Sequence, residues 1–341
     1  MIREQTVGVV IPAYKAAHTI ASVLAGIPEF VDHIVVVDDG SPDGTIDAAT
    51  RAGDSRVKCV RREKNGGVGA AMATGFAHIL VQPVDIIVKM DADGQMDPEL
   101  LPELLMPLTD LDFDYSKGNR FYDISALREM PLPRRLGNIA LSFLTKVASG
   151  YWNVYDPQNG YLAIRREVLE RLDLASLDPT YFFENSMLVQ LNIVRARVAE
   201  VPIPARYGDR GTSMNLAKIV LVFPWKLLRA GLTRVRLKYF GMDFSPIAVL
   251  LTTGSALFAG GFIFGAYEWT KNALAGVPTS AGTVMLAALP TLLGGQLLLN
   301  ALLLDIAQTP PGMGIRRISS GGPKVGAGGS PRKQRNRGPD P

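Results

Sequence analysis

Two carboxylates separated by one residue, Asp91 and Asp93, end a mostly apolar run of the chain. Side chains at positions i and i+2 of an extended backbone point the same way, so both carboxylates could face one cation or one diphosphate. Carboxylate oxygens suit Mg²⁺ or Mn²⁺, which commonly bridge protein carboxylates to nucleotide phosphates. An isolated Asp-x-Asp also occurs in polar turns after buried strands, so the rest of the chain has to decide between these interpretations.

The elements that must position this pair follow a strand-helix rhythm. Strand-like runs at residues 7–11, 33–38, 57–61 and 85–90 alternate with helix-like stretches at 17–26, 45–52, 69–80 and 98–108. This rhythm predicts an α/β fold with a mostly parallel sheet covered on both faces. Ligands of such sheets bind beyond the carboxyl ends of the strands. We therefore expect Pro12-Ala13-Tyr14, Asp38-Asp39-Gly40-Ser41 and Asp91-Ala92-Asp93 to meet in one crevice.

Two loops of this region have more than one interpretation. Asp38 and Asp39 are interpreted as ligands of a ribose or base, whereas Asp43 fits a ligand or a helix cap equally well. The glycine-rich segment 65–71 is not a dinucleotide loop, because Met72 stands where the third required glycine would be. Close backbone packing beside a nucleotide and a plain helix entry both remain open for it.

The C-terminal third is apolar enough to cross a membrane. The chain has 341 residues, 47% of them hydrophobic, and residues 244–267 and 272–304 carry no charge. At roughly 1.5 Å per residue the first run spans about 36 Å as a helix, more than a hydrocarbon core of about 30 Å. The connector around Glu268 and Lys271 is poor in cations and both outer flanks are rich in them, which predicts that both termini are cytoplasmic.

Basic residues are concentrated beside these apolar runs. The formal net charge is +4, with six cations and no carboxylate between residues 215 and 240 and seven cations after Ile306. Anionic lipid is a simpler partner for them than nucleic acid, so no nucleic-acid partner is expected. Residues 215–240 are interpreted as one or two interfacial helices with Pro224 as a break, and the tail as disordered. The predicted division is a catalytic domain at 1–214, interfacial helices at 215–243, a transmembrane hairpin at 244–305 and a basic tail at 306–341.

An ordered set of motifs spans residues 5–215. Its members are Val10 to Tyr14, Val37 to Thr45, Asn65 to Ala71, Asp91 to Gln95, Lys117 to Phe121 and Asp156 to Tyr161. This set resembles the family 2 glycosyltransferases with a GT-A fold, and among them the polyprenyl-phosphate sugar synthases typified by dolichol-phosphate mannose synthase. The two apolar runs that follow are similar to those of the membrane-anchored branch.

The resemblance implies roles for individual residues. The nucleotide's base and ribose would be held by Pro12, Ala13, Tyr14, Asp38 and Asp39. The metal and the donor diphosphate would be held by Asp91 and Asp93, with Gln95 beside them. The acceptor phosphate would meet Arg120 with Arg134 or Arg135, for which surface salt bridging is the alternative. The family often has an arginine followed by Gly-x-Ser-Lys, but Met214 replaces that lysine here, so contact of Arg206 or Arg210 with the diphosphate is a weaker inference.

The resemblance also bears on the acceptor. Family members that use a hydroxyl acceptor typically take its proton with the second carboxylate of a Glu-Asp pair, and the comparable place here is Glu184-Asn185. An amide cannot accept that proton. A phosphate monoester, with a second pKa near 6, is already largely ionised at neutral pH, so the missing aspartate favours a phosphate acceptor.

The sequence therefore predicts an inverting, metal-dependent enzyme that moves a hexose from a UDP- or GDP-linked sugar to a polyprenyl phosphate at the cytoplasmic face of the cell membrane. Catalytic residues would be Asp91, Asp93, Arg120 and Glu184, and a homo-oligomer is compatible with the sequence. Two alternatives remain. One is transfer to a sugar or lipid hydroxyl with Glu184 as base, and the other is a non-catalytic membrane scaffold that keeps a nucleotide-binding fold.

Overall fold

The computed structural model describes residues 1–122, 132–204, 216–241, 245–310 and 312, without the side chains of 132–136, 138 and 216–221. Its N-terminal part is built on a seven-stranded sheet of order β3-β2-β1-β4-β6-β5-β7. The strands are β1 (Val7–Ala13), β2 (His33–Asp38), β3 (Val57–Arg61), β4 (Ile86–Lys89), β5 (Tyr115–Asn119), β6 (Leu162–Arg165) and β7 (Val198–Pro202). Only β6 runs antiparallel to its neighbours, β4 and β5, among the described strands. The predicted mostly parallel α/β fold is confirmed.

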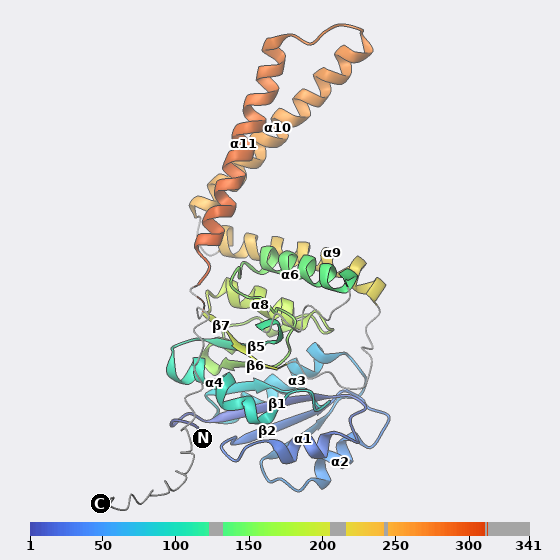
Figure 1. Cartoon of the computed structure of the whole chain (residues 1–341), viewed down its shortest axis with the longest axis vertical. Helices are drawn as coiled ribbons and strands as arrows, with labels where there is room; N and C mark the ends of the chain where they lie inside the picture. The colour runs from blue at the N-terminus through green and yellow to red at the C-terminus, as the bar shows by residue number, and fades with distance from the viewer. Residues whose placement is uncertain (123–131, 205–215, 242–244, 311, 313–341) are drawn as a thin grey trace, which may run out of the picture.

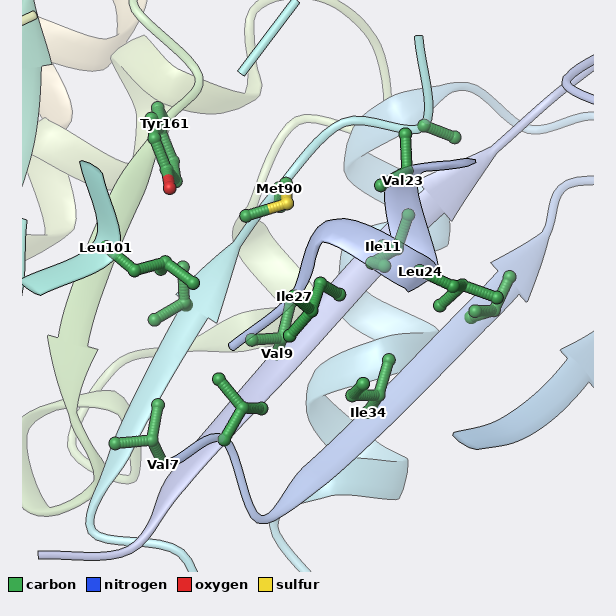
Figure 2. Close-up of a cluster of buried hydrophobic side chains, with 14 of the residues drawn as sticks. Val7, Val9, Ile11, Val23, Leu24, Ile27, Ile34, Met90, Leu101 and Tyr161 are labelled. Carbon is green, nitrogen blue, oxygen red and sulfur yellow. The ribbon is translucent and has the colours of Figure 1, made fainter. Parts of the chain in front are cut away.

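Helices cover both faces of the sheet. One face carries α1 (Ile20–Gly26), α2 (Thr45–Arg51) and α4 (Leu101–Asp110), with a 3₁₀ turn, η1 (Pro98–Leu100), before α4. Figure 2 shows its core, where side chains of β1, α1 and β4 meet. The other face carries α3 (Val68–Ile79) and α8 (Phe183–Ile193). Every residue of β1 is buried, as expected for a strand with apolar layers on both sides. The four strands and four helices predicted before residue 110 are all confirmed.

Short elements connect the later strands. They are η2 (Arg120–Tyr122), α7 (Arg166–Leu169) and η3 (Leu174–Ser176). Beyond α8, on the side away from the sheet, lie α6 (Leu132–Ser149) and α9 (Leu216–Arg236), which pack together through Ala148, Phe182 and Leu227. In Figure 1 these two helices lie side by side across the top of the catalytic fold.

The prediction that Pro224 breaks the interfacial segment is wrong. Pro224 lies inside α9, which continues to Arg236 and ends in a π-helical turn, η4 (Leu237–Gly241). A proline removes one backbone hydrogen bond from a helix, and the packing of Leu227 against Phe182 and Ala148 holds the helix together just after it.

The two apolar runs form a helical hairpin, α10 (Pro246–Leu274) and α11 (Ala281–Ala307). Ser245 and Ser280 cap their first turns through side-chain oxygens. The expected connector around Glu268 and Lys271 is wrong, because both residues lie inside α10 and the turn comes at residues 275–280, where Gly276 takes a positive φ. Pro290 lies well inside α11 and does not mark its entry.

Small residues let the two hairpin helices approach closely. A Cβ at Gly261 would meet Thr291, and one at Gly265 would meet Ala287, both on α11. These glycines therefore lie at the contact between α10 and α11, where small residues allow close packing of membrane helices.

A buried ion pair joins the foot of the hairpin to the catalytic fold. The guanidinium of Arg234, at the end of α9, donates to both carboxylate oxygens of Asp305 on α11, at 2.8 and 2.9 Å. Arg234 also donates to the Ala148 carbonyl of α6, and the Tyr239 hydroxyl donates to Asp305. Figure 1 shows the resulting layers, with the hairpin standing on α9 and α6 and the sheet beneath them.

Candidate active site

The three polar segments lie at neighbouring strand ends, as the sequence predicts. Ala13 at the end of β1 pairs with Asp38 at the end of β2, and Val10 pairs with Lys89 at the end of β4. The hydroxyl of Thr19, before α1, donates to the Ala92 carbonyl at 2.7 Å and ties the acidic segment to the β1 side. These contacts place the segments together at the carboxyl ends of β1, β2 and β4.

The acidic pair lies in a turn and not on extended backbone. β4 ends at Lys89, so the expectation that strand geometry orients Asp91 and Asp93 alike does not hold. Asp93 is exposed, and its Oδ1 accepts the backbone N–H of Gln95 at 2.9 Å. Desolvation raises the pKa of Asp93, and the nearby charge of Asp91 raises it further. The two carboxylates are thus close enough to interact.

A buried lysine holds the first carboxylate from below. The ammonium of Lys89, 1% exposed, donates to Asp91 Oδ1 at 2.7 Å and to the Gly160 carbonyl at 3.2 Å, and it lies 3.3 Å from Glu184 Oε1. Burial alone would lower the pKa of this lysine, but the charges of Asp91 and Glu184 outweigh that effect and raise it. Lys89 therefore remains an ammonium that joins β4 to α8.

Gly160 fits between these charges because it has no side chain. A Cβ at this position would lie 2.5 Å from Lys89 Nζ and 3.3 Å from both Asp91 Oδ2 and Glu184 Oε1. Any larger residue would push the ammonium away from its two carboxylates.

The carboxylates after β2 organise loops. Asp39, nearly fully buried, accepts the backbone N–H groups of Gly66 and Gly67 and pairs with the Arg62 guanidinium. Asp38 accepts the backbone N–H of Ser41 at 3.0 Å, and its Oδ2 is buried without a hydrogen-bond partner among the described residues. The Asp39 carboxylate thus fixes the glycine-rich segment beside the strand ends.

The glycine-rich segment packs backbone to backbone against a distant loop. A Cβ at Gly69 would overlap the Asp178 carbonyl, and one at Gly67 would lie 2.6 Å from the Pro179 carbonyl. The Pro179 carbonyl accepts the N–H of Ala70, at the start of α3. The segment is a helix entry, since α3 begins at Val68, and its close backbone packing is against the loop of Asp178 and Pro179. Packing beside a nucleotide stays a prediction.

The β1 loop and the β2 loop are bonded to each other. Ser41 Oγ accepts the Lys15 N–H, and Thr45 Oγ1 accepts the Ala16 N–H. Asp43 accepts the Thr45 hydroxyl, which lowers the pKa of Asp43. Gly44 is the N-cap of α2, so Asp43 is not a helix cap. Tyr14 is exposed at the end of β1.

A second group of charges lies just after β5, before β6 and on β7. The Arg120 guanidinium, 37% exposed, makes a two-pronged contact with Asp156, from Nε at 2.8 Å and from Nη2 at 2.9 Å. Asp156 is itself held by Glu200, whose Oε1 accepts the backbone N–H groups of Tyr155 and Asp156. Glu200 Oε2 accepts from the Asn119 amide. Arg120 therefore forms the salt bridge that the sequence gave as its alternative role, but with a buried partner.

Glu184 and Asn185 begin α8 and point to different partners. Glu184 faces Lys89, whereas the Asn185 carbonyl oxygen accepts the Thr145 hydroxyl of α6 at 3.2 Å. Position 185 thus faces the neighbouring helix and offers no carboxylate to the site.

Four predicted arginines have no described side chain. Arg134 and Arg135 lie in the first turn of α6, and Arg210 lies outside the described residues, as does Arg206. Most of the basic tail after Pro310 also lies outside them.

Comparison with known proteins identifies the family. A profile described as Glycosyl transferase family 2 matches residues 8–173. A polyprenol monophosphomannose synthase of Mycolicibacterium smegmatis is 33% identical over 60% of this chain and 79% of its own length. An undecaprenyl-phosphate mannosyltransferase of Micrococcus luteus is 31% identical over 65% of this chain and 97% of its own. The chain belongs to glycosyl transferase family 2.

Other relatives of this family 2 glycosyltransferase differ in sugar. A UDP-N-acetylglucosamine–dolichyl-phosphate N-acetylglucosaminyltransferase of Methanococcus voltae is 28% identical over 62% of this chain and 92% of its own. A glucosyl-3-phosphoglycerate synthase of Mycobacterium tuberculosis, solved with UDP, aligns with a TM-score of 0.51 at 24% identity, over 68% of this chain and 80% of its own. The same synthase was also solved with Mn²⁺ and UDP-glucose, at a TM-score of 0.50. This likeness shows the GT-A fold.

The donor set of the glycosyltransferase fits a shared divalent ion. Among the residues that the structure describes, no three His, Cys, Asp or Glu side chains gather in a metal-binding group. The pair Asp91 and Asp93 supplies hard oxygen ligands, and Mg²⁺ is usually held by one or two carboxylates with water and substrate phosphates completing its shell. The pair thus fits an ion that the donor diphosphate helps to hold.

Sequence reasoning gave no role to Lys89, Lys117, Asp156 or Glu200. A signal existed for Lys89, because it interrupts a run that is predicted to be a buried strand, and a lysine is almost never fully buried unless its charge is compensated. Finding the compensating carboxylates required the fold.

Proposed function

We propose that this chain transfers a hexose, with inversion, from a nucleoside-diphosphate sugar to a polyprenyl phosphate at the cytoplasmic face of a membrane. The proposal is supported by the family, by relatives named for transfer to polyprenyl or dolichyl phosphates, and by the site. Beyond membership of the family, we thus propose a polyprenyl phosphate acceptor, a divalent metal ion and a cytoplasmic orientation of the site.

The donor would lie over the ends of β1, β2 and β4. Tyr14 and the backbone of Pro12 and Ala13 would hold the base and ribose together with Asp38, and Asp39 would act by fixing the glycine-rich segment. A Mg²⁺ or Mn²⁺ ion bound by Asp91 and Asp93 would supply Lewis-acid stabilisation of the charge that grows on the departing nucleoside diphosphate. Gln95 would lie at the same end.

Lys89 would assist the departure of the nucleoside diphosphate by holding Asp91 in place. Its ammonium fixes the Asp91 carboxylate from below, so that Asp91 needs no reorganisation when the diphosphate arrives. The same ammonium faces Glu184. Transfer of an acceptor proton to Glu184 would remove the charge that pairs with the Lys89 ammonium.

The partners of Glu184 and Asn185 favour a phosphate acceptor. Glu184 faces a buried ammonium and Asn185 bonds to Thr145, so positions 184 and 185 offer no uncommitted base. An acceptor that is already ionised, such as a phosphate monoester, needs none. Arg120 would contact that phosphate, with Arg134 or Arg135 and with Arg210 near the diphosphate as further candidates.

The outer layers support a membrane location. Helices α10 and α11 are long and apolar enough to cross a bilayer. At the foot of α10 and α11, apolar side chains of α6 and α9 are exposed. They include Ile139 and Phe143 of α6 and Trp225 and Leu232 of α9. A shallow hollow of about 230 Å³ on α9 mixes apolar side chains with arginines, the combination that suits lipid headgroups; it is lined by Trp225, Leu228, Arg229, Leu232, Thr233 and Arg236.

The decisive experiment offers purified protein a panel of UDP- and GDP-sugars with Mn²⁺ and either a short polyprenyl phosphate or the matching polyprenol, with products read by mass spectrometry. We expect a hexosyl phosphate lipid from the phosphate acceptor alone. Transfer to polyprenol would support the hydroxyl acceptor with Glu184 as base. No transfer to any acceptor, together with nucleotide binding by calorimetry, would support the scaffold.

A further inference from the structure

A lysine beneath the site has a position that packing alone does not explain. Lys117 on β5 pairs in register with Leu162 on β6 and with Glu200 on β7, and Leu162 pairs with Lys89 on β4. Residues paired in register lie in one row across a sheet, and their side chains point to the same face. Lys117, Lys89 and Glu200 therefore all project toward the face that carries α8.

The Lys117 ammonium is buried without a hydrogen bond. Its exposed fraction is 0%, and Nζ has no hydrogen-bond partner within the described part of the chain. Burying an ammonium is costly unless neighbouring charges offset the lost hydration. The charges of three carboxylates offset part of this cost, those of Asp156 before β6, Glu200 on β7 and Glu184 on α8, while the charge of Arg120 opposes them.

The pKa of Lys117 reflects the opposing effects of burial and of the neighbouring charges. Burial lowers it from 10.5 to about 8, although the charges of Asp156, Glu200 and Glu184 act to raise it. Burial raises the pKa of Glu200, and the charge of Lys117 acts to lower it. Lys117 and Glu200 thus stabilise each other's charged forms.

The acids next to Lys117 are the ones that place Arg120. Glu200 holds the backbone of residues 155 and 156, and Asp156 holds the guanidinium of Arg120 through two hydrogen bonds. A change in the charge or position of Glu200 is therefore transmitted to Arg120 through a single intervening residue.

We propose that Lys117 is a positioning residue whose buried charge keeps Glu200 and Asp156 in the arrangement that presents Arg120 to the acceptor phosphate. The inference rests on the proposed function, because it assumes that Arg120 receives that phosphate. Lys117 touches no reactant itself, since its ammonium does not reach the surface.

The test replaces Lys117 by methionine, which keeps the length of the side chain and removes its charge, and by arginine, which keeps the charge. The matched control is Lys58→Met, on β3 in the same row of the sheet but exposed at its far edge. We expect K117M to raise the KM for polyprenyl phosphate by about 10-fold or more, the usual cost of losing a supporting contact, with the donor KM nearly unchanged. K117R should restore most of the loss, and K58M should behave like the wild type.

A pH profile separates positioning from packing. In the wild type, the KM for the acceptor should rise as the pH passes about 8 and Lys117 loses its proton. K117M should lack this rise, while ionisation of the acceptor phosphate remains the same in both proteins. An unchanged acceptor KM in K117M, or the same rise in both proteins, would overturn the proposal.

A double-mutant cycle protects the test against a folding defect. Glu200→Gln should raise the acceptor KM as K117M does, and the double variant should be little worse than either single variant, because both act on one linkage. Additive losses would refute the linkage. Absence of a lipid product from the wild type would reject the proposed function instead, so the two failures are distinguishable.

Discussion

The proposed site has two halves that are held together by different means. We call the region at the ends of β1 and β2 the donor half and the region around Arg120, Asp156 and Glu200 the acceptor half. On the donor half, carboxylates bind backbone amides, as Asp39 binds the N–H groups of Gly66 and Gly67 over a sequence separation of 27 and 28 residues. On the acceptor half, the central contact joins two charged side chains, Arg120 and Asp156, which lie 36 residues apart. Lys89 at the end of β4 and Asp91 just after it lie between the halves.

This difference teaches what each half tolerates. Backbone amides remain whatever the side chain, so the donor half should be sensitive to changes in shape and less sensitive to changes in charge. The acceptor half concentrates buried carboxylates and cations, where removing one partner leaves another uncompensated. Mutations of shape and of charge should therefore separate donor binding from acceptor binding.

The largest effect is expected where the halves meet. Asp93→Ala removes one carboxylate of the acidic pair and should lower kcat by about 100-fold or more, the scale of losing one preorganised electrostatic contact in a transition state. Transfer of radiolabelled sugar to the lipid phosphate measures it. EDTA should abolish the wild-type activity and Mn²⁺ should restore it. Undiminished turnover by D93A would reject the metal assignment.

Breaking the acceptor half should come next. Asp156→Asn keeps the shape but removes the charge that holds Arg120, and we expect kcat/KM for polyprenyl phosphate to fall by about 30- to 100-fold, since misplacing a contact by about 1 Å can cost about 100-fold. Calorimetry with the nucleotide and Mn²⁺ serves as the control and should show nearly unchanged donor affinity. Equal losses for donor and acceptor would contradict the separation of the two halves.

The donor half is tested by shape. Gly69→Ala places a methyl group against the Asp178 carbonyl, so the glycine-rich segment or the loop at residues 178–180 must move. We expect nucleotide affinity to weaken by about 10-fold, or about 1.4 kcal/mol, with a smaller change in acceptor KM. Gly137→Ala, on α6 with no heavy atom within 4 Å of the added methyl, is the matched control. If Gly69→Ala weakened only the binding of the acceptor, the glycine-rich segment would belong to the acceptor half instead.

The last effect is on stability, and its sign is opposite to that on function. The pKa of Lys117 is about 8 in the folded protein and 10.5 in the unfolded chain, so between these values the unfolded chain binds more protons and stability rises with pH. The gain over that window is at most about 3 kcal/mol. The melting temperature of the wild type relative to K117M should rise between pH 8 and 10, while acceptor affinity falls. If the melting temperatures of the wild type and K117M changed with pH in the same way, Lys117 would not be the cause of the rise.

The donor half could be predicted from the sequence, whereas in the acceptor half the arginines could be predicted but not the buried charges that hold Arg120. Alternating runs placed Pro12, Asp38 and Asp91 at neighbouring strand ends, because strand order in a parallel sheet follows local patterns. Glu200 lies on β7, far along the chain, and nothing local links it to Lys117 or Asp156. The Asp91 turn and the uninterrupted helix through Pro224 depended on tertiary packing, which outweighs local preference.

The ion pair between Arg234 and Asp305 has a consequence for the choice of lipid. Swinging α10 and α11 relative to the sheet would break a buried charged contact, at a cost of several kcal/mol. In a hairpin that spans the bilayer, this rigidity fixes how far the reacting groups stand from the leaflet. We expect such an enzyme to select substrates by the depth of their phosphate, and to tolerate isoprenoid tails of very different lengths because the tail stays among the acyl chains.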